Sequence, residues 1–354
     1  MGNKQAKVLH LVDDLAMGGV NVALASLMES ELNTEYDFAS LCVCFRSPRQ
    51  WWRALRAIKQ HQADIICLHY AANWSRIGFT LLLRLCFSGR IALQEHHYSR
   101  GFVEHNVKTP KRFYWMLKLM YRSVDRVLCI SVSQRLWMLE QQLISADRLI
   151  FVGQGCQRLN LLAVTPKPLE QPLVVGAYGR FNQQKGFDIL VQAATLLDPA
   201  LVQLKIAGEG PQYAQLRALA EDSDNIEFIG KVDDIALFMQ QVDIVAIPSR
   251  WEPFGLTCME SLLAGKPVMI SLADGLPEQV DYLLAANLVQ AWPRFTAMTP
   301  VAFAAAISQT VNQLQARESR PQSLAISSDA RQRVAQSWPA LIQRWRLTLM
   351  KLAD

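Results

Sequence analysis

The sequence has little cysteine chemistry and no long apolar run. Its seven cysteines are an odd number, and no Cys-x-x-Cys pair occurs among them. Most stand in apolar segments typical of strands, so the spacing favours buried thiols over a disulfide framework or a structural metal site. The longest uncharged stretch, between Arg294 and Arg317, contains Pro300 and several amides. This interruption excludes a membrane span of about 20 apolar residues.

Two further signals are missing. Before the first predicted strand there is neither the apolar region nor the small-residue cleavage site of a secretory signal. No Gly-x-Gly-x-x-Gly and no Walker lysine pattern occurs, which argues against a nicotinamide-dependent or P-loop enzyme. Together with the unpaired cysteines, the missing signal predicts a cytoplasmic protein.

The chain is long and rich in apolar residues, which make up 51% of its 354 positions. Single cores stop growing near about 250–300 residues, so this length predicts two domains. Short apolar segments alternate with amphipathic ones, which predicts βαβ units, parallel sheets and an α/β fold. The predicted strands are residues 8–12, 38–44, 65–69, 91–94 and 127–130, then 174–178, 203–207, 226–229, 244–247 and 268–271.

A proline-rich segment separates the two sets of strands. Residues 165–172 hold three prolines, which predicts a stiff, extended linker. We therefore expect two doubly wound, Rossmann-like domains at residues 1–165 and 166–336, with a last helix at 337–354. In such folds ligands bind beyond the carboxyl ends of the strands, and two facing domains would form one cleft.

Charge is distributed unevenly between the halves. Residues 1–165 hold 20 Lys and Arg against 12 Asp and Glu, net +8, whereas residues 166–354 hold 16 against 19, net −3; together they give the +5 of the whole chain. The first half is therefore expected to meet an anionic partner.

Aromatic residues accompany these cations on two predicted helices. Arg49, Arg53 and Arg56 share one helical face, and Trp115 and Lys118 share a stripe farther along. Basic amphipathic helices with aromatic side chains are typical of peripheral membrane binding, although an ordinary solvated face is the alternative for either helix alone. No nucleic-acid recognition motif accompanies the charge, so we expect an anionic membrane surface and no nucleic acid.

The first motif with chemical meaning is the turn after the first predicted strand, where Gly18 and Gly19 precede a helix. Glycine lets the backbone approach a ligand closely, and a helix N-terminus offers free N–H groups and partial positive charge. A tight turn without a ligand is the alternative.

The second motif follows the first strand of the second half. Arg180 and Lys185 flank a glycine-bounded loop in residues 176–186. An arginine fork and a lysine point charge that converge on one anion suit a diphosphate. Two solvated loop cations are the alternative.

The third motif pairs two carboxylates, Glu252 and Glu260, around a loop and a helix start. Both would accept hydrogen bonds from hydroxyl groups of a polyol ligand, with the backbone N–H groups of Phe254, Gly255 and Leu256 beside them. A helix-capping acid and a solvated acid are the alternatives for the two residues.

These segments, in this order, resemble the GT-B glycosyltransferases of family 4, the retaining nucleotide-sugar transferases. The resemblance includes Gly-Arg-Phe and Lys-Gly within residues 179–186, Gly-Glu-Gly-Pro at 208–211, the Glu-x7-Glu motif at 252–260 and Ala-Gly-Lys-Pro-Val at 264–268. It covers the second half closely and the first half more loosely. One departure is Asp274, where the family often has glycine.

The resemblance implies roles for the cations and glycines. Arg180 and Lys185 would hold the donor diphosphate, and Gly18 and Gly19 would bring the first domain against it. The last helix would cross back to the first domain, as it does in the family.

It also implies roles for the acids and for a histidine. Glu260 would take the ribose hydroxyls and Glu252 those of the donor sugar. A histidine after the fourth strand would stand near the reacting sugar, and both His96 and His97 fit that position. The nucleotide pocket would be completed by Gly208, Gly210 and the backbone around Ile229.

The expected enzyme is a retaining hexosyltransferase that needs no metal and no cofactor, since Arg180, Lys185 and helix N-termini can neutralise the departing nucleoside diphosphate. Its donor would be a nucleotide-sugar, with UDP favoured over GDP. Its acceptor would be a lipid-linked or phosphorylated glycan of lipopolysaccharide or another surface polysaccharide, on the cytoplasmic face of a membrane. A nucleotide-sugar epimerase of the same fold and a non-catalytic sugar-binding subunit are the alternatives.

Overall fold

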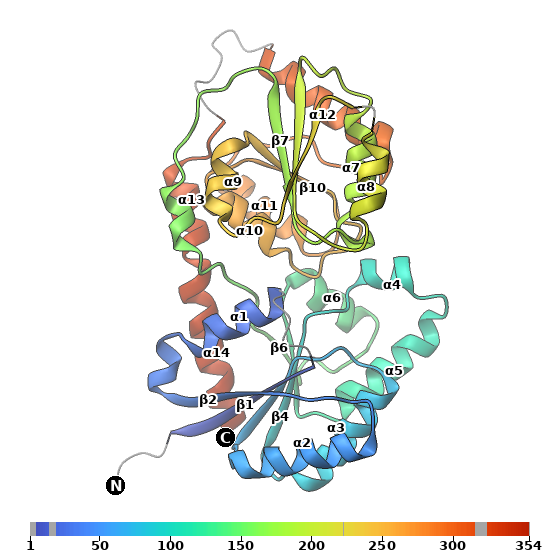
Figure 1. Ribbon diagram of the computed structural model, residues 1–354. Helices are drawn as coiled ribbons and strands as arrows, with labels where there is room; N and C mark the ends of the chain where they lie inside the picture. Colours follow the sequence, from blue (N-terminus) through green and yellow to red (C-terminus); the bar gives the residue numbers. More distant parts are fainter. Residues whose placement is uncertain (1–4, 14–18, 222, 316–323, 354) are drawn as a thin grey trace. The chain divides into compact units, whose positions relative to one another are not determined.

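The computed structural model describes residues 5–13, 19–221, 223–315 and 324–353, and the chain divides into two compact units. The first unit comprises residues 1–154 and 338–354, and the second residues 155–337. Each unit contains one sheet whose strands pair in parallel, with helices beside it (Figure 1). The predicted α/β fold with two doubly wound parallel sheets is confirmed.

The sheet of the first unit has six strands in the order β2-β1-β3-β4-β5-β6. Leu11 lies opposite Leu68, which lies opposite Leu93, so the residues that follow these strands gather at one edge. This carboxyl edge is where parallel α/β sheets bind ligands. The strands are β1 (Ala6–Val12), β2 (Tyr36–Cys42), β3 (Ile65–Leu68), β4 (Arg90–Glu95), β5 (Arg126–Cys129) and β6 (Leu149–Phe151).

Polar caps fix the start of several helices in this unit. The side chains of Asn73, Ser99 and Ser131 each accept a backbone N–H of the helix that follows, which satisfies one of its free donors. The helices are α1 (Gly19–Met28), α2 (Pro48–His61), α3 (Trp74–Cys86), α4 (Arg100–Asn106), α5 (Pro110–Arg122), α6 (Val132–Glu140) and the 3-10 helix η1 (Glu31–Thr34), with α14 (Ser337–Ala353) joining from Trp338 on.

The sheet of the second unit has the order β11-β10-β7-β8-β9. Its faces are covered by separate apolar clusters: Val175 and Ala177 of β7 point into one, and Val174 and Tyr178 into the other. A strand buried on both faces explains the nearly continuous apolar segment in the sequence. The strands are β7 (Leu173–Tyr178), β8 (Val202–Ala207), β9 (Ile226–Gly230), β10 (Ile244–Ile247) and β11 (Val268–Ile270).

The helices of the second unit lie between and after these strands. Long α12 packs beside α7, with Phe303 and Ile307 fully buried. The helices are α7 (Phe187–Ala194), α8 (Tyr213–Leu219), α9 (Ile235–Gln241), α10 (Leu256–Leu263), α11 (Leu276–Ala285), α12 (Pro300–Gln315), α13 (Ser328–Ala335) and the 3-10 helices η2 (Leu159–Ala163) and η3 (Gln183–Lys185).

The boundary between the units falls after Gln154, earlier than the predicted residue 165. The reason is apolar packing: Cys156, Leu161 and Val164 are buried in the core of the second unit. The segment before the prolines therefore folds with the unit that follows it. No helix in the described ranges is long and apolar enough to cross a membrane.

Candidate active site

An ion pair joins two of the predicted site residues in the second unit. Lys185, at the end of η3, places Nζ 2.5 Å from Oε2 of Glu252, and the side chains are 19% and 9% exposed. Ser249 Oγ donates to the same carboxylate oxygen at 3.0 Å. No partner of Glu252 Oε1 occurs within the described ranges, so this oxygen is available to a ligand hydroxyl.

Asp274 holds the backbone of Glu252. Its Oδ2 accepts the Glu252 N–H at 2.9 Å, and the Glu252 carbonyl accepts the N–H of Gly275 at 3.0 Å. Asp274 has a φ of +39°, a left-handed conformation that favours glycine. This agrees with the resemblance noted above, in which the family often has glycine at this position. The aspartate tolerates this conformation and adds a hydrogen bond that glycine cannot make.

A second ion pair, which was not predicted, ties the two loops of this site together. The guanidinium of Arg250 donates to both carboxylate oxygens of Asp188 in α7, at 2.7 and 2.6 Å, and to the carbonyl of Gln183 at 2.8 Å. Such bidentate pairs fix geometry strongly. Arg250 therefore holds the loop after β10 against η3, and its place in the loop that leaves that strand was the only signal in the sequence.

Glu260 lies midway along α10 and is held by two groups that were also not predicted. Tyr178 OH donates to Oε2 at 2.9 Å, and Arg158 Nε lies 2.9 Å from Oε1. Burial raises the pKa of the Glu260 carboxyl, while Arg158 and Tyr178 act to lower it. A carboxylate oxygen can accept two hydrogen bonds, so each oxygen keeps capacity for a ligand hydroxyl.

The glycine loop after β8 packs directly on the loop after β7. A Cβ atom at Gly208 would stand 1.9 Å from the Gly179 carbonyl oxygen, and one at Gly210 would stand 2.5 Å from that of Phe181. Only glycine fits such close backbone approach. Ile229, in neighbouring β9, is partly buried at the same edge of the sheet.

The remaining predicted residues of this unit surround the same strand ends. Arg180 is exposed, and its guanidinium has no hydrogen bond or ion pair within the described ranges. Phe254 and Gly255 are buried before α10, which begins at Leu256, and Gln279 Nε2 donates to the Phe254 carbonyl at 2.5 Å. The second unit thus brings its cations, acids and glycine loop to one edge.

The predicted histidines belong to the first unit, directly after β4. Buried Glu95 organises them: its Oε1 accepts the N–H groups of His97 and Tyr98 at 2.8 and 3.1 Å, and its Oε2 accepts Tyr121 OH at 2.9 Å. His96 and His97 are both partly exposed.

The two predicted glycines of the first unit lie before α1. Gly19 is the first residue of that helix, as the turn-and-helix motif indicates. Gly18 lies outside the described residues.

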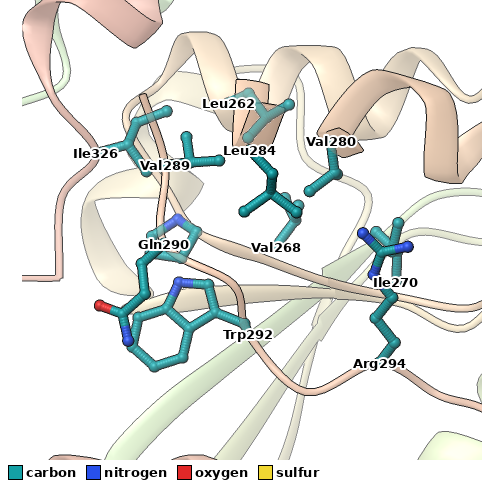
Figure 2. Close-up of a pocket in the computed structure, with 11 residues that line it drawn as sticks. Leu262, Val268, Ile270, Val280, Leu284, Val289, Gln290, Trp292, Arg294 and Ile326 are labelled. Atoms are coloured by element: carbon teal, nitrogen blue, oxygen red, sulfur yellow. The ribbon is translucent and has the colours of Figure 1, made fainter. Parts of the chain in front are cut away.

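A small apolar hollow in the second unit is separate from these groups. It holds about 20 Å³ and lies between α10, α11 and the segment after α11, where Leu262, Val280, Leu284 and Trp292 line it (Figure 2). This volume suits about one water molecule. No predicted site residue lines this hollow.

Metal binding has no evident location in the described part of the chain. No three His, Cys, Asp or Glu side chains there are grouped to hold an ion. Independence from metal and cofactor stays a prediction.

Comparison with known proteins places this geometry in a family. Residues 8–156 match the family Glycosyltransferase Family 4, and residues 172–313 match Glycosyl transferases group 1. An uncharacterized glycosyltransferase of Methanocaldococcus jannaschii is 27% identical over 63% of this chain and 60% of its own length. The lipopolysaccharide core biosynthesis glycosyltransferase LpsE of Rhizobium meliloti is 32% identical over 44% and 46%. The chain thus matches about half of these relatives' length.

A solved structure shares the fold of the whole chain. The crystal structure of Anabaena HepE in complex with UDP and glucose has a TM-score of 0.70 and 18% identity, covering 98% of this chain and 100% of HepE. The two matched families together span most of both units. The chain therefore belongs to the group 1, family 4 glycosyltransferases of GT-B fold.

Proposed function

We propose that this protein transfers a sugar from a nucleotide-sugar, with a UDP-sugar favoured, to a lipid-linked or phosphorylated glycan acceptor. The product would serve lipopolysaccharide or another surface polysaccharide. The observation that carries the proposal is the ion pair between Lys185 and Glu252, a cation and an acid beyond the carboxyl ends of the strands.

The cations suit the leaving group. When the bond between the anomeric carbon and the phosphate oxygen breaks, its electron pair and a negative charge go to the nucleoside diphosphate. Lys185 Nζ has three N–H donors and gives one to Glu252, so two are free for phosphate oxygens. Arg180, exposed beside the same loop, can add a bidentate contact.

The acids suit the neutral parts of the donor. Glu252 keeps Oε1 available for sugar hydroxyls, while its Oε2 stays bound to Lys185. Glu260 is held rigid by Tyr178 and Arg158 and has acceptor capacity for two ribose hydroxyls. Because these acids are fixed before a ligand arrives, little ordering is needed on binding.

The stereochemical proposal is retention without a metal ion. The acceptor oxygen would attack on the face that the phosphate leaves, and its proton would pass to the departing phosphate oxygen. Charge is then neutralised by the side chains of Arg180 and Lys185 and by helix N-termini.

The choice of donor and acceptor draws on relatives. The solved HepE complexes contain UDP and glucose, which supports a UDP-sugar donor here. LpsE is named for lipopolysaccharide core biosynthesis, which supports a glycan acceptor carried on lipid.

The surface of the first unit supports a membrane location for such an acceptor. The rings of Trp74 and Trp115, 45% and 60% exposed, lie 5.6 Å apart and join α3 to α5, whose exposed cations include Lys111 and Arg122. Exposed tryptophan beside basic residues suits the interface of an anionic bilayer. The enzyme would then act at the cytoplasmic face.

The experiment supplies radiolabelled UDP-sugars and GDP-mannose separately to the purified protein with a bacterial lipid extract. Transfer of label to lipid from one donor is the expected result. Release of an isomerised sugar without acceptor would identify an epimerase. Binding of the donor with neither outcome would identify a non-catalytic subunit.

A further inference from the structure

Three histidines from three neighbouring strands form a continuous hydrogen-bonded chain in the first unit. His10 Nδ1 lies 2.8 Å from His69 Nε2, and His69 Nδ1 lies 3.1 Å from His96 Nε2. His10 belongs to β1, His69 follows β3 and His96 follows β4. The parallel register brings them to one edge although they are far apart in the sequence.

The inner end of this row of histidines, at His10, is enclosed by the core. His10 is fully buried, and its Nε2 has no hydrogen-bond partner in the described part of the chain. Its ring stacks on Phe38 at 5.6 Å and meets the edge of Trp345 at 6.2 Å. Burial lowers the pKa of His10 and of His96 to about 3, and that of His69 well below its usual value, so the three rings are neutral at neutral pH.

Neutral rings in series leave only two proton arrangements. A neutral imidazole has one N–H donor and one bare nitrogen acceptor, so each hydrogen bond in the chain fixes the next. In one arrangement the unpartnered His10 Nε2 is a bare acceptor; in the other it is an N–H donor with no partner. Among buried backbone groups, orphaned N–H donors are rarer than unfilled acceptors, and by the same preference we take the bare acceptor at His10 Nε2.

The first arrangement determines what His96 presents to its surroundings. His10 Nδ1–H donates to His69 Nε2, and His69 Nδ1–H donates to His96 Nε2. The proton of His96 is then on Nδ1, which has no partner within the described ranges.

Neighbouring His97 carries its proton on the other ring nitrogen, Nε2. Its Nε2 lies 3.3 Å from the carbonyl oxygen of His69, which can only accept, so this nitrogen carries a proton. The Nδ1 of a neutral His97 is therefore an acceptor. The two adjacent histidines are not interchangeable.

We propose that His10 and His69 are positioning residues that hold His96 as a single Nδ1–H tautomer, so that His96 donates a hydrogen bond to an oxygen of the bound substrate. The assignment of this oxygen to a hydroxyl of the donor sugar rests on the proposed function. The tautomer of His96 does not depend on that function. The geometry also selects His96 over His97 as the donor.

The tautomers are measured directly by long-range ¹H–¹⁵N correlation spectra of the full chain labelled with ¹⁵N-histidine, at pH 7 and without substrate. The expected spectrum shows His96 with protonated Nδ1 and bare Nε2. A protonated Nε2, or an averaged mixture of both tautomers, would overturn the proposal.

Two variants at His10 separate a positioning role from a packing role. His10→Leu removes the donor to His69, so we expect His96 to become a tautomer mixture and kcat for sugar transfer to fall about 10-fold. His10→Asn puts an amide N–H near the position of Nδ1, and it should restore the single tautomer and most of kcat. A His10→Leu chain that folds and keeps pure Nδ1–H at His96 would overturn the positioning role.

The control is His61→Gln at an exposed histidine on α2, which should change neither the His96 signals nor the rate. Should His10→Leu fail to fold, the unmodified chain and His10→Asn still decide the tautomer. A parental protein that shows the expected tautomers and transfers no sugar would reject the proposed function alone.

Discussion

Lys185 Nζ and Glu252 Oε2 lie 2.5 Å apart in the second unit, so the residue expected to bind phosphate already contacts the residue expected to bind sugar. Neither charge is left alone at a largely buried position, where an unpaired charge is costly. The pair keeps both side chains oriented before a donor arrives. A donor that carries phosphate and sugar hydroxyls side by side would meet both groups at once.

Glu260→Gln should weaken nucleoside diphosphate binding by about 10- to 100-fold, because hydrogen bonds to a charged group contribute about 1.5–3 kcal/mol. Calorimetry with UDP and 2′-deoxy-UDP measures this. If Glu260 takes ribose hydroxyls, the deoxy compound should lose far less affinity in the variant than UDP does. Equal losses for both nucleotides would contradict a ribose contact. Glu227→Gln, which removes an acid paired with Lys205 on the edge of the sheet, is the matched control.

Gly208→Ala should destabilise the second unit by about 1–3 kcal/mol and weaken donor binding, because its Cβ would collide with the Gly179 carbonyl and displace the loop that carries Arg180. Gly230→Ala is the control, since Gly230 also has positive φ but no atom lies within 4 Å of an added Cβ. Both variants place alanine at a positive φ, so the larger loss of stability expected for Gly208→Ala in urea denaturation reports mainly the collision. Equal stability of the two would show that the loops are free to separate.

Much of the framework could be predicted from the sequence. Strand β10 was predicted with its observed bounds, since Ile244–Ile247 is wholly apolar and stands between polar segments. Strand β6 was missed, because its three residues give no periodicity. The domain boundary was placed too late because prolines signal a linker, whereas buried Leu161 shows which core the preceding segment joins.

The site was only half predictable. Motif order in the sequence singled out Lys185, Glu252 and Glu260, but not the groups that hold Glu260. Arg158 lies about a hundred residues before Glu260, and only the fold joins them. The histidine chain was equally hidden, because His10 and His69 are 59 positions apart and meet through parallel register.

The free energy of unfolding should fall as pH decreases below about 6.5. His10 and His96 stay neutral in the folded chain down to a pKa of about 3, whereas both take up a proton in the unfolded chain near pH 6.5. The unfolded state therefore binds more protons in this window, and stability is fully present only above it. Each histidine contributes a loss of up to about 1.4 kcal/mol per pH unit.

Urea denaturation at pH 7, 6 and 5.5 measures this slope. His10→Asn should reduce the slope of unfolding free energy against pH by the contribution of one histidine. His61→Gln, at an exposed position, should leave this slope unchanged. A slope in His10→Asn equal to that of the parental chain would contradict neutral burial of His10.

Binding to vesicles should depend on anionic lipid and on cations of α5. Lys111→Gln and Arg122→Gln should each weaken vesicle binding about fivefold, since a cation near an anionic surface contributes about 1 kcal/mol. Flotation with and without anionic lipid measures it, and Lys231→Gln, which removes an exposed lysine of the second unit, is the control. Equal flotation on neutral vesicles would contradict electrostatic attachment.

The role of Lys185 is tested most directly by the transfer rate of Lys185→Ala. Removing one preorganised group that stabilises developing charge costs about 10²–10³ in rate. Lys205→Ala is a close control, because Lys205 is equally shielded, at 18% exposed, and is likewise paired with a glutamate. We expect Lys185→Ala to lose at least about 10²-fold in kcat, and Lys205→Ala to stay near the parental rate. A Lys185→Ala chain that is folded and transfers sugar at the parental rate would contradict a role of Lys185 in charge stabilisation.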